Sequence, residues 1–409
     1  MNRPQKSSAT SASIPKTASA FAGFLSACGD ELERLRRQSL ERGLLTIDVS
    51  QSPFLHVDGK SFINWSSNDY LGLSGHPRLV QAAKRALDSF GVGGRASRLL
   101  TGTTAWHARL EETLADYFGA EAALVFASGY LANLGAIGAL CGKGDTVYLD
   151  RLCHASLIDA VRASQAALRV FRHNDADHLR ALLSRRRSGR TLVVTEGVFS
   201  MDGDSAPLAA LLSVAEKHGA ILYVDDAHGV FVRGKTGRGS LEEAGIRSDR
   251  VLHMATLGKA AGCNGGFVAG PRVLIRWLLQ KARAFIYATA LPASIAAAAM
   301  ESLAVMRDEP QRREKLLRLS ARLHAALREQ RLTPLSSASH ILPVRVGQAA
   351  DAVQLAADLR NEGHFCPAIR PPTVPARTAR LRISLTAAHS DENVRQLADA
   401  LKVCRPVLP

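Results

Sequence analysis

The sequence has few cysteines: six are spread over 409 residues, and none forms a CxxC pair or a spacing typical of zinc ligands. Isolated cysteines of this kind favour reduced thiols in a protein of cytosolic type and argue against a disulfide framework. We therefore expect a cytoplasmic localisation and no metal site. The six positions are Cys28, Cys141, Cys153, Cys263, Cys366 and Cys404.

Long apolar runs are also missing. No clean stretch of about 18 apolar residues occurs, so we expect no membrane span. The nearest run, residues 122–141, is interrupted by serine, asparagine and three glycines, and it predicts a buried strand, a turn and a helix. Hydrophobic residues make up 46% and charged residues 22%, which is typical of a globular chain and excludes a wholly disordered or fibrous one.

Acidic residues are scarce: the chain has 37 of them and 52 lysines and arginines, so its net charge is +15. A basic surface attracts anions in general, including nucleic acid, acidic lipid and phosphorylated cofactors, and charge alone does not choose among them. The most basic segment, a helix expected after Pro310, has its arginines on the face opposite its leucines. Such a face is most often merely solvated, so we expect no nucleic-acid partner.

The N-terminal segment has no acidic residue before Asp30. Residues 1–20 are rich in serine, alanine and threonine and are predicted to form a disordered tail, although an organelle transit peptide has the same composition. From Phe21 to Arg42, apolar residues at helical spacing predict a helix that Gly43 can end. We expect residues 21–60 to form an arm of this helix and a hairpin.

The body of the chain alternates strand-length apolar runs with helical segments, and no internal repeat is visible. This order predicts an α/β fold with a mostly parallel sheet covered by helices on both faces. We expect a large domain over residues 61–304 and a small C-terminal α+β domain over residues 305–409. The five expected strands of the large domain are residues 123–127, 146–150, 191–195, 221–225 and 251–255.

Polar residues follow each of these five strands. Ligands of parallel α/β sheets bind at the carboxyl ends of the strands, so we expect the five strand ends to share one site. The residues concerned are Ser128-Gly129, His154, Glu196-Gly197, residues 225–228 and residues 256–259.

Lys259 is the first residue that points to a particular chemistry. It follows an expected strand in a glycine-containing turn, where partial burial can lower its pKa and let it form a Schiff base. A single lysine in a turn is more often structural, but Asp225 and His228 stand about thirty residues earlier. A carboxylate at the end of a buried strand is costly unless it meets a cation or hydrogen bonds. A protonated pyridine nitrogen is such a cation, and His228 could reach a neighbouring oxygen.

Two further strand ends complete the pattern. Gly129 and Tyr130 follow Ser128 at the start of an expected helix, where backbone N–H groups form a ready phosphate site. His154 follows the next expected strand and could stack on a flat aromatic ring. Each residue alone has a plainer interpretation, as a turn glycine or a core histidine. Together they describe a phosphate cradle, a ring platform, a pyridine partner and an aldehyde-binding lysine, which indicates a site for pyridoxal phosphate.

A second motif points elsewhere. Residues 229–236 read GVFVRGKT and match the phosphate-loop pattern GxxxxGK[ST]. A phosphate loop wraps backbone N–H groups around phosphates and then starts a helix. Here the middle residues are bulky and β-prone, and Gly237 and Gly239 oppose a following helix. A nucleotide hydrolase and a basic nucleic-acid-binding protein therefore stay only as remote alternatives.

The chain resembles the α-oxoamine synthases, pyridoxal phosphate enzymes of the aspartate-aminotransferase fold (fold type I). The resemblance covers about residues 40–390. Its motifs are NDYLGLS (68–74), SRLLTGT (97–103), EGVFSMDGD (196–204), DDAHG (225–229), TLGK (256–259) and RPPTVP (370–375). Several motifs in one order are far more specific than any one of them.

The resemblance implies roles for the residues that contact the cofactor. Lys259 would hold the cofactor covalently and later move the substrate proton. Asp225 would pair with the pyridine nitrogen, and His154 would stack on the ring. His228 and Ser200 would contact the oxygen of the ring.

The resemblance also implies a phosphate site and a substrate site. Gly129 and Tyr130 would bind the phosphate through their N–H groups, and Thr256 would add its hydroxyl. The family is a homodimer with its site between subunits, which implies a further phosphate contact from the partner's Thr289. The substrate residues would be Arg42, Asn68, His154, Thr373 and Arg382, with Arg382 gripping the carboxylate of the amino acid by two hydrogen bonds.

The family reaction is a decarboxylative condensation of an amino acid with an acyl thioester. Residues 370–375 and 378–389 look most like the branch that joins L-alanine to a pimeloyl thioester in biotin synthesis. The thioester would be carried by coenzyme A or by acyl carrier protein, and the net charge of +15 suits either anionic carrier. A paralogue that uses another acyl chain or glycine stays open as an alternative.

Overall fold

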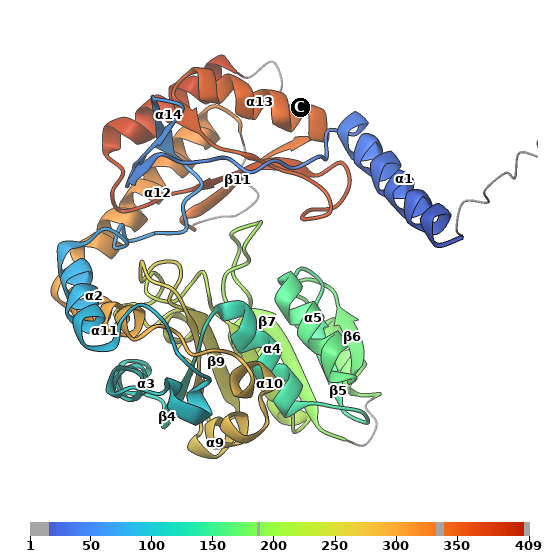
Figure 1. Cartoon of the computed structure of the whole chain (residues 1–409), viewed down its shortest axis with the longest axis vertical. Coiled ribbons are helices and arrows are strands. Elements are labelled where there is room, and N and C mark those ends of the chain that lie inside the picture. Colours follow the sequence, from blue (N-terminus) through green and yellow to red (C-terminus); the bar gives the residue numbers. More distant parts are fainter. Residues whose placement is uncertain (1–15, 186–188, 333–338, 405–409) are drawn as a thin grey trace, which may run out of the picture.

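The structure is a computed structural model that describes residues 16–185, 189–332 and 339–404. Its largest sheet has seven strands in the order β4-β10-β9-β8-β7-β5-β6. This sheet lies in the lower half of Figure 1, where five of its strands are labelled. Neighbouring strands run parallel except at β10, which is antiparallel to both β4 and β9. The strands are β4 (Ala122–Phe126), β5 (Thr146–Asp150), β6 (Ala167–Phe171), β7 (Thr191–Glu196), β8 (Ile221–Asp225), β9 (Val251–Thr256) and β10 (Gly266–Gly270).

All five strands expected from the sequence are present, with ends that differ by at most one residue, and two strands were not expected. β6 lies at the edge of the sheet, and most of its residues are exposed or half-buried, so its sequence lacks a buried strand's apolar run. β10 begins and ends in glycine, a residue typical of turns, so its sequence did not predict a strand. The predicted fold class, a mostly parallel sheet flanked by helices, is confirmed.

Helices cover both faces of the sheet. Successive residues of a strand point to opposite sides of the sheet, so each strand contributes side chains to two cores. In β7, Leu192 belongs to the core beneath one set of helices and Val193 to the core on the other side. The first set is α4 (Gly129–Leu140), α5 (Ala155–Ser164), α9 (Arg272–Lys281) and α10 (Arg283–Ile286). The second set includes α6 (Ala176–Leu183) and α7 (Leu208–Lys217), with the short α8 (Ser240–Glu243) nearby.

Three further helices flank the β4 end of the sheet: α2 (Pro77–Phe90), α3 (Ala105–Phe118) and α11 (Ala293–Asp308). α2 begins at Pro77, and Gly91 ends it with a φ of 69° that suits glycine. The glycine-containing loop that follows holds one π-type turn, η1 (Arg98–Gly102). α11 packs along α2 and runs through residue 305, where we expected a domain boundary. The domain limits therefore stay a prediction.

The C-terminal part forms a three-stranded antiparallel sheet of β11 (Ile341–Gly347), β14 (Ala379–Ser384) and β13 (Ala368–Ile369). Helices α12 (Gln311–Glu329), α13 (Ala349–Asn361) and α14 (Asp391–Val403) accompany it. The buried leucines of α12 are Leu316, Leu319, Leu323 and Leu327. The expected hairpin is β2 (Phe54–Val57) and β3 (Lys60–Asn64), preceded by β1 (Val49–Gln51). β12 (His364–Phe365) pairs with β3, so the N-terminal arm attaches to the C-terminal part.

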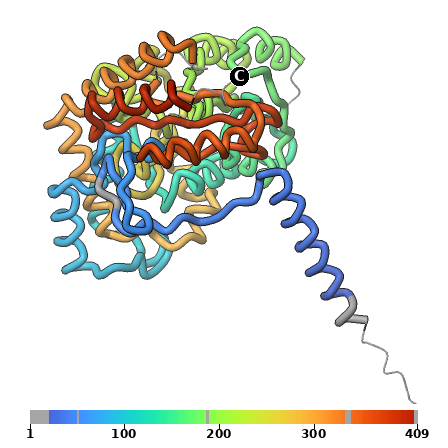
Figure 2. Tube along the Cα trace, turned by 90° about the horizontal axis from the view of Figure 1, so that it is seen from above, coloured from blue at the N-terminus to red at the C-terminus, as the bar shows by residue number. Residues whose placement is uncertain are grey.

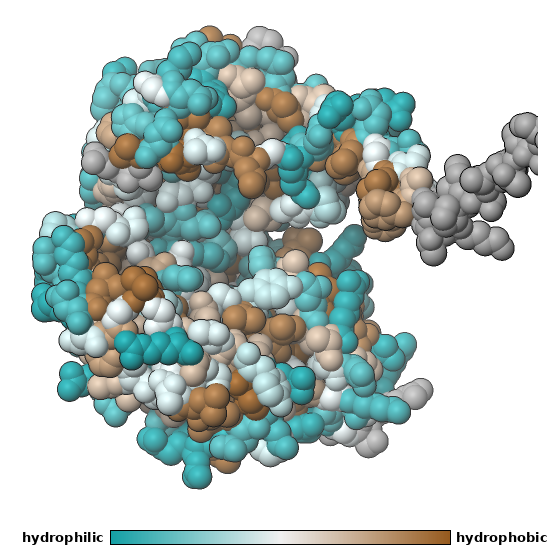
Figure 3. All heavy atoms as spheres, in the orientation of Figure 1, coloured by the Kyte–Doolittle hydropathy of each residue, from teal (hydrophilic) through white to brown (hydrophobic). Residues whose placement is uncertain are grey.

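The first helix differs from its prediction. α1 spans Lys16–Arg37, so it begins before Phe21, within the expected tail, and ends before Arg42. Ser39 adopts a left-handed conformation with a φ of 55° and turns the chain there, which left Gly43 no role in ending the helix. The apolar side chains Phe21, Leu25 and Leu32 are more than half exposed on this projecting helix (Figures 1, 2 and 3). Residues 1–15 of the expected tail lie outside the described residues.

Two expectations from composition can be compared with the structure. All six cysteines are free thiols. Among the described helices, none has the length and apolar character that crossing a membrane requires.

Candidate active site

The carboxyl ends of β8 and β9 meet the start of α4 around a cavity of about 190 Å³. This is the place where sequence reasoning expected one shared site. Seven predicted site residues line the cavity: Gly129, Tyr130, His154, Asp225, His228, Thr256 and Lys259. It is also lined by Asn133, Ser156, Glu196, Ala227 and Met254, to which no role was given in advance.

Lys259 projects from the turn after β9, where its carbonyl oxygen accepts a hydrogen bond from the Gly262 N–H. Its Nζ lies 2.8 Å from Nε2 of His228. Burial lowers the pKa of Lys259 to about 8, although the carboxyl groups of Asp225 and Glu196 act in the opposite direction. A substantial fraction of the amine is therefore neutral near pH 7 to 8, as attack on an aldehyde requires.

Asp225 ends β8 and is only 5% exposed. One carboxylate oxygen accepts a hydrogen bond from Asn133 Nδ2 at 2.7 Å, and the other accepts one from the Ala227 N–H at 3.0 Å. Asn133 is fixed in turn, because its Oδ1 accepts a hydrogen bond from the Tyr223 hydroxyl at 2.9 Å. The carboxylate is thus held rigidly at the cavity wall, where it can meet a cationic ring nitrogen.

The start of α4 forms the anion-binding end of the cavity. Ser128 caps the helix, since its Oγ accepts a hydrogen bond from the Leu131 N–H. The N–H groups of Gly129 and Tyr130 are in the first turn and have no acceptor within the helix. A Cβ at Gly129 would lie 3.2 Å from the side chains of Met254 and Thr256, so glycine permits this close approach to β9.

Thr256 lines the same end of the cavity, but its hydroxyl donates to the Gly265 carbonyl oxygen at 2.8 Å. Its oxygen also accepts a hydrogen bond from the Gly258 N–H. The expected phosphate contact of Thr256 thus stays a prediction. As a set, the cavity combines an amine of lowered pKa, an ordered carboxylate and a helix N-terminus. This combination fits the aldehyde, the ring nitrogen and the phosphate of pyridoxal phosphate.

His228 and His154 stand on the wall of this cavity in different environments. His228 is 5% exposed, and burial, together with the nearby positive charge of Lys259 and Arg382, holds its pKa well below the ordinary value. Its Nδ1 lies 2.6 Å from the Tyr70 hydroxyl. His154 has an exposed side toward solvent, and its Nδ1 lies 2.8 Å from Ser156 Oγ. The protein atoms packed around its other side displace water from the ring, and this desolvation lowers its pKa.

Glu196 is a residue of the cavity to which sequence reasoning gave no role, although it was noted as a polar strand end. It is 2% exposed and accepts hydrogen bonds from the N–H groups of His154, at 2.6 Å, and Ser200, at 3.3 Å. Burial, followed by the charge of Asp225, raises the pKa of Glu196 well above its ordinary value. The sequence shows that Glu196 ends an apolar strand, but it does not show that Glu196 lies next to Asp225.

Three residues predicted to bind substrate or cofactor are brought together by the C-terminal sheet. Arg382 is 8% exposed on β14, and its guanidinium donates to the Ser200 carbonyl oxygen and to Asn68 Oδ1. It also donates to the Tyr70 hydroxyl at 3.3 Å, which connects it to His228. Tyr70 was within a quoted motif, but no role was assigned to it.

Arg42 and Thr373 lie elsewhere. Both are exposed, and the segment that contains Arg42 is tied to the loop of Thr373, because Arg370 donates to the carbonyl oxygens of Ser39 and Glu41. Within the described residues, no hydrogen bond joins either side chain to the Lys259 cluster. Their substrate roles therefore stay predictions.

The phosphate-loop pattern does not build a phosphate cradle. Glu242 accepts hydrogen bonds from the N–H and hydroxyl of Thr236 and from the Arg238 N–H. These donors therefore already bind a carboxylate of the protein and do not point to a phosphate. The helix that follows, α8, has only four residues.

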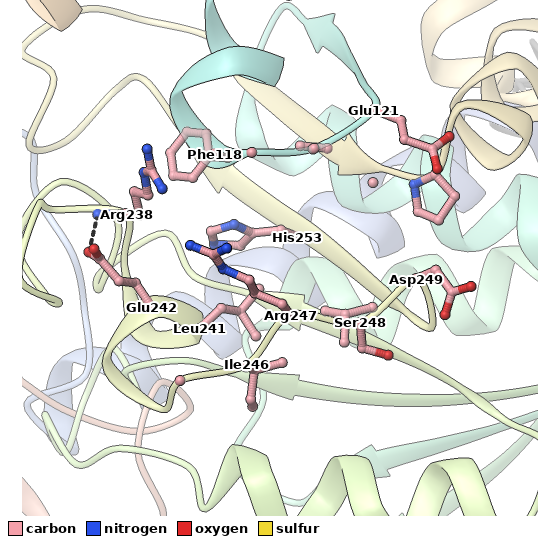
Figure 4. A pocket seen from close by; sticks show the side chains of 17 residues that line it. Phe118, Glu121, Arg238, Leu241, Glu242, Ile246, Arg247, Ser248, Asp249 and His253 are labelled. Carbon is pink, nitrogen blue, oxygen red and sulfur yellow. Dashed lines mark hydrogen bonds between the residues drawn. The ribbon is translucent and has the colours of Figure 1, made fainter.

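A larger cavity, of about 620 Å³, lies at the opposite end of β9 (Figure 4). Its charged side chains are mixed in sign, including Arg238, Arg247, Glu121 and Asp249. His253, on its wall, is committed to a buried contact with Asp226 at 3.1 Å. This cavity pairs no lysine with a carboxylate, so we place the active site in the smaller one.

Comparison with known proteins agrees with this assignment. Residues 60–401 match the family model of the class I and II aminotransferases. A curated 8-amino-7-oxononanoate synthase from Chromobacterium violaceum is 48% identical over 374 residues, which cover 91% of this chain and 95% of that protein.

Two solved structures are similar in fold. A serine palmitoyltransferase from S. paucimobilis, whose structure holds a pyridoxal phosphate–myriocin compound, has a TM-score of 0.88 and 32% identity. The match covers 95% of this chain and 98% of that one. An 8-amino-7-oxononanoate synthase from Francisella tularensis has a TM-score of 0.72 and 28% identity, over 84% of this chain and 97% of that one. The chain thus belongs to the class I and II aminotransferase family and, within it, to the 8-amino-7-oxononanoate synthases.

Proposed function

We propose that this protein condenses L-alanine with a pimeloyl thioester and releases carbon dioxide, a free thiol and 8-amino-7-oxononanoate, a step of biotin biosynthesis. The observation that carries the proposal is the 48% identity to a named synthase over nearly its whole length. The cavity around Lys259, Asp225 and His228 supports it, because it offers the groups that this chemistry needs.

Pyridoxal phosphate is the cofactor of the proposed reaction. When bound, it supplies an electron sink that stabilises negative charge on the carbon next to the substrate's amino group. Lys259 would hold its aldehyde carbon, and Asp225 would keep its ring nitrogen protonated. The N–H groups of Gly129 and Tyr130 would bind its phosphate.

Lys259 also suits the proton transfer. When it is not bonded to the cofactor, its Nζ would be a free amine of lowered pKa, and it lies 2.8 Å from the His228 ring, whose pKa burial holds well below the ordinary value. Such an amine can take a proton from the substrate and return it at a working pH near neutrality. Neutrality of His228 matters here, because a cation at that distance would oppose protonation of the amine.

Arg382 and Asn68 are proposed to hold the amino acid. The Arg382 guanidinium is buried and anchored to Ser200 and Tyr70, so its remaining donor capacity is fixed in direction. A carboxylate bound there would replace the long contact of 3.3 Å between Arg382 and Asn68. The acyl thioester would arrive on coenzyme A or acyl carrier protein, both anionic, to which the net charge of +15 is complementary.

We further propose a homodimer in the cytoplasm. Large apolar side chains near η1 and α10 are open to solvent in the single chain, including Leu99, Leu100 and Tyr287 at 49%, 77% and 71% exposure. Exposed apolar side chains gathered in one region favour an interface. Thr289 lies in the same region, bridged to Ser97, and is exposed, as a contact to a second subunit would require.

The test is thiol release from pimeloyl-CoA by protein loaded with pyridoxal phosphate, with L-alanine and, separately, with glycine. We expect release that requires L-alanine, together with a product of the mass of 8-amino-7-oxononanoate. The same assay with pimeloyl-acyl carrier protein identifies the preferred carrier. Cofactor binding without thiol release from either thioester would contradict the proposed substrates and leave the cofactor assignment intact.

A second candidate is condensation of another amino acid with a longer acyl-CoA. It is favoured by the TM-score of 0.88 to a serine palmitoyltransferase, against 0.72 to the synthase from Francisella tularensis. Fold similarity does not fix the substrate, whereas the identity of 48% to a named synthase exceeds the 32% to the palmitoyltransferase. L-serine with palmitoyl-CoA is the matching arm of the assay, and we expect no release from it.

A further inference from the structure

His340 lies directly before β11 and is fully buried, with 0% exposure. Neither of its ring nitrogens has a hydrogen-bond partner among the described residues. Its ring meets the ring of Tyr70 edge-on, with 4.1 Å between the centroids and 69° between the planes. Tyr70 is also fully buried, at 0% exposure.

This environment is unusual among the buried histidines of the chain. His107 contacts the Leu291 carbonyl oxygen through Nε2, and His389 accepts from the Thr386 N–H and contacts the Asn64 carbonyl oxygen. Buried polar groups are normally paired, and an unpaired one costs free energy that an apolar ring of the same shape would avoid. Packing alone therefore does not explain why an imidazole stands at position 340.

Tyr70 connects His340 to the active site. Its hydroxyl lies 2.6 Å from His228 Nδ1 and 3.1 Å from Asn68 Oδ1, and it accepts a hydrogen bond from Arg382. A phenol has one proton, so it can donate to His228 or to Asn68 but not to both. The choice decides which nitrogen of His228 carries hydrogen.

The tautomer of His228 then decides its contact with Lys259. If Tyr70 donates to Nδ1, Nε2 carries the proton and donates to the neutral Lys259 amine, 2.8 Å away. If Tyr70 donates to Asn68, Nδ1 carries the proton and Nε2 is an acceptor toward Lys259. The two arrangements favour different protonation states of the lysine.

We propose that His340 is a positioning residue of the active site: its polar ring, held against Tyr70, sets the direction of the Tyr70 hydroxyl and thereby the hydrogen bond between His228 and Lys259. It acts through Tyr70 and does not line the cavity that holds the cofactor.

The surroundings of His340 keep its ring in one protonation state, so its effect on Tyr70 does not change with pH. The charged groups that act on its pKa are Arg233, Arg382 and Lys259, and all are positive. Burial and these cations lower the pKa of His340 to about 3. The ring is therefore neutral throughout the working pH range, and only its dipole and its shape act on Tyr70.

The test replaces the imidazole by an apolar ring, in His340→Phe, and measures how the full-length apoprotein takes up pyridoxal phosphate. It rests on the proposed function only through the cofactor, because the readout is the pH midpoint of the rate at which the visible absorbance band forms, and this midpoint reports the proton affinity of the free Lys259 amine. We expect the midpoint to move by roughly half a pH unit or more, which is about a threefold change in proton affinity. The melting temperature of the apoprotein should be unchanged or higher, since an unpaired polar group has been removed.

A double-mutant cycle shows whether the effect passes through Tyr70. In a Tyr70→Phe background, which lacks the hydroxyl, His340→Phe should cause no further shift of the midpoint. His107→Phe is the matched control, because it removes a buried and hydrogen-bonded imidazole far from Lys259 in the chain; it should lower the melting temperature and leave the midpoint unchanged.

Two outcomes overturn the proposal: an unchanged midpoint in His340→Phe, or a shift of the same size with and without the Tyr70 hydroxyl. If the phenylalanine variant does not fold, His340→Leu, which fills less space, takes its place in the same cycle. A wild-type protein that gives no visible band with pyridoxal phosphate would instead refute the proposed function, so the two failures are distinguishable.

Discussion

Glu196 and Asp225 are register partners at the carboxyl ends of β7 and β8, so two carboxyl groups stand side by side on the floor of the active site. Two carboxylates so placed in a region of low dielectric cannot both ionise readily. Asp225 has the Asn133 amide as a donor to stabilise its charge, and burial raises the pKa of Glu196. The two carboxyl groups thus differ in their donors: Asp225 has a side-chain amide beside it, whereas Glu196 has only backbone N–H groups.

The pair predicts a particular pH dependence of stability. Because the folded-state pKa of Glu196 is raised, the folded protein binds its proton more tightly than the unfolded chain does. Stability from this group is complete below the unfolded pKa, about 4.5, and is lost as the pH rises above it. Glu196→Gln removes this loss, so we expect the variant to gain stability relative to the wild type between pH 5 and pH 8.

Urea unfolding of the two apoproteins at several pH values measures this difference. At pH 5 the free energy of unfolding of the variant should be lower by about 1 kcal/mol. The reason is that an amide NH2 group replaces one of the two oxygens that accept hydrogen bonds from backbone N–H groups. A difference that stays constant with pH would show that Glu196 is ionised in the folded protein. Glu121→Gln, at a position exposed to solvent, serves as the control and should show little change.

Lys259→Ala separates the proposed chemistry from the nucleotide alternative. We expect no visible cofactor band, no cofactor trapped by borohydride, and a fall in kcat of roughly a thousandfold, in line with loss of a nucleophile and base. Lys235→Ala, in the phosphate-loop pattern, should keep full activity because Lys235 is exposed and lies outside the cavity. The reverse result would favour a nucleotide-binding enzyme.

Loading of the apoprotein should depend on pH through the same lysine. Only the neutral amine attacks an aldehyde, and the pKa of Lys259 is about 8, so its neutral fraction is about a tenth at pH 7 and a half at pH 8. We expect the rate of band formation after mixing with pyridoxal phosphate to rise about fivefold between these values and to level off near pH 9. A rate that is flat across this range would mean that the amine is already neutral at pH 7.

Arg382→Lys should affect the amino acid and spare the cofactor. A lysine keeps the positive charge but loses the planar pair of donors, and it cannot hold Ser200, Asn68 and Tyr70 together. We expect the KM for L-alanine to rise roughly tenfold, while borohydride still traps the cofactor on Lys259. Loss of trapping would show that Arg382 instead supports the architecture around Lys259.

The sequence was sufficient for those parts of the site that come from strand ends. Asp225, His228 and Lys259 follow apolar runs closely, so the parallel sheet alone places them together. Glu196 could be seen as a strand end, but its raised pKa depends on its burial and on the pairing of β7 with β8, which no local pattern encodes. Tyr70 and His340 are 270 residues apart in the chain, and only tertiary packing brings their rings together.

The helices show a similar division. Pro77 and Gly91 mark the two ends of α2 by their own backbone preferences, so both ends are visible in the sequence. α1 was misplaced at both ends, since its C-terminus depends on a serine in a left-handed conformation and on Arg370, which binds the following carbonyl oxygens. Its apolar spacing predicted a helix, which is present, and Phe21 and Leu25 on that helix are exposed in the single chain. The pattern of apolar residues thus predicts the helix but does not identify a partner for its apolar face.

The exposed apolar region around η1 gives the last prediction, which concerns assembly. Leu100 is 77% exposed on η1, and the exposed Tyr287 and Thr289 follow α10, which contacts η1. If a second copy covers this region, Leu100→Arg places an unpaired charge in an apolar interface, which costs several kcal/mol. We expect light scattering after size exclusion to give a monomer for the variant and a dimer for the wild type, and activity to fall with dimer content. Val403→Arg, a charge added at an equally exposed valine on α14, should leave a dimer. A wild-type monomer with full activity would rule out a site that needs two subunits.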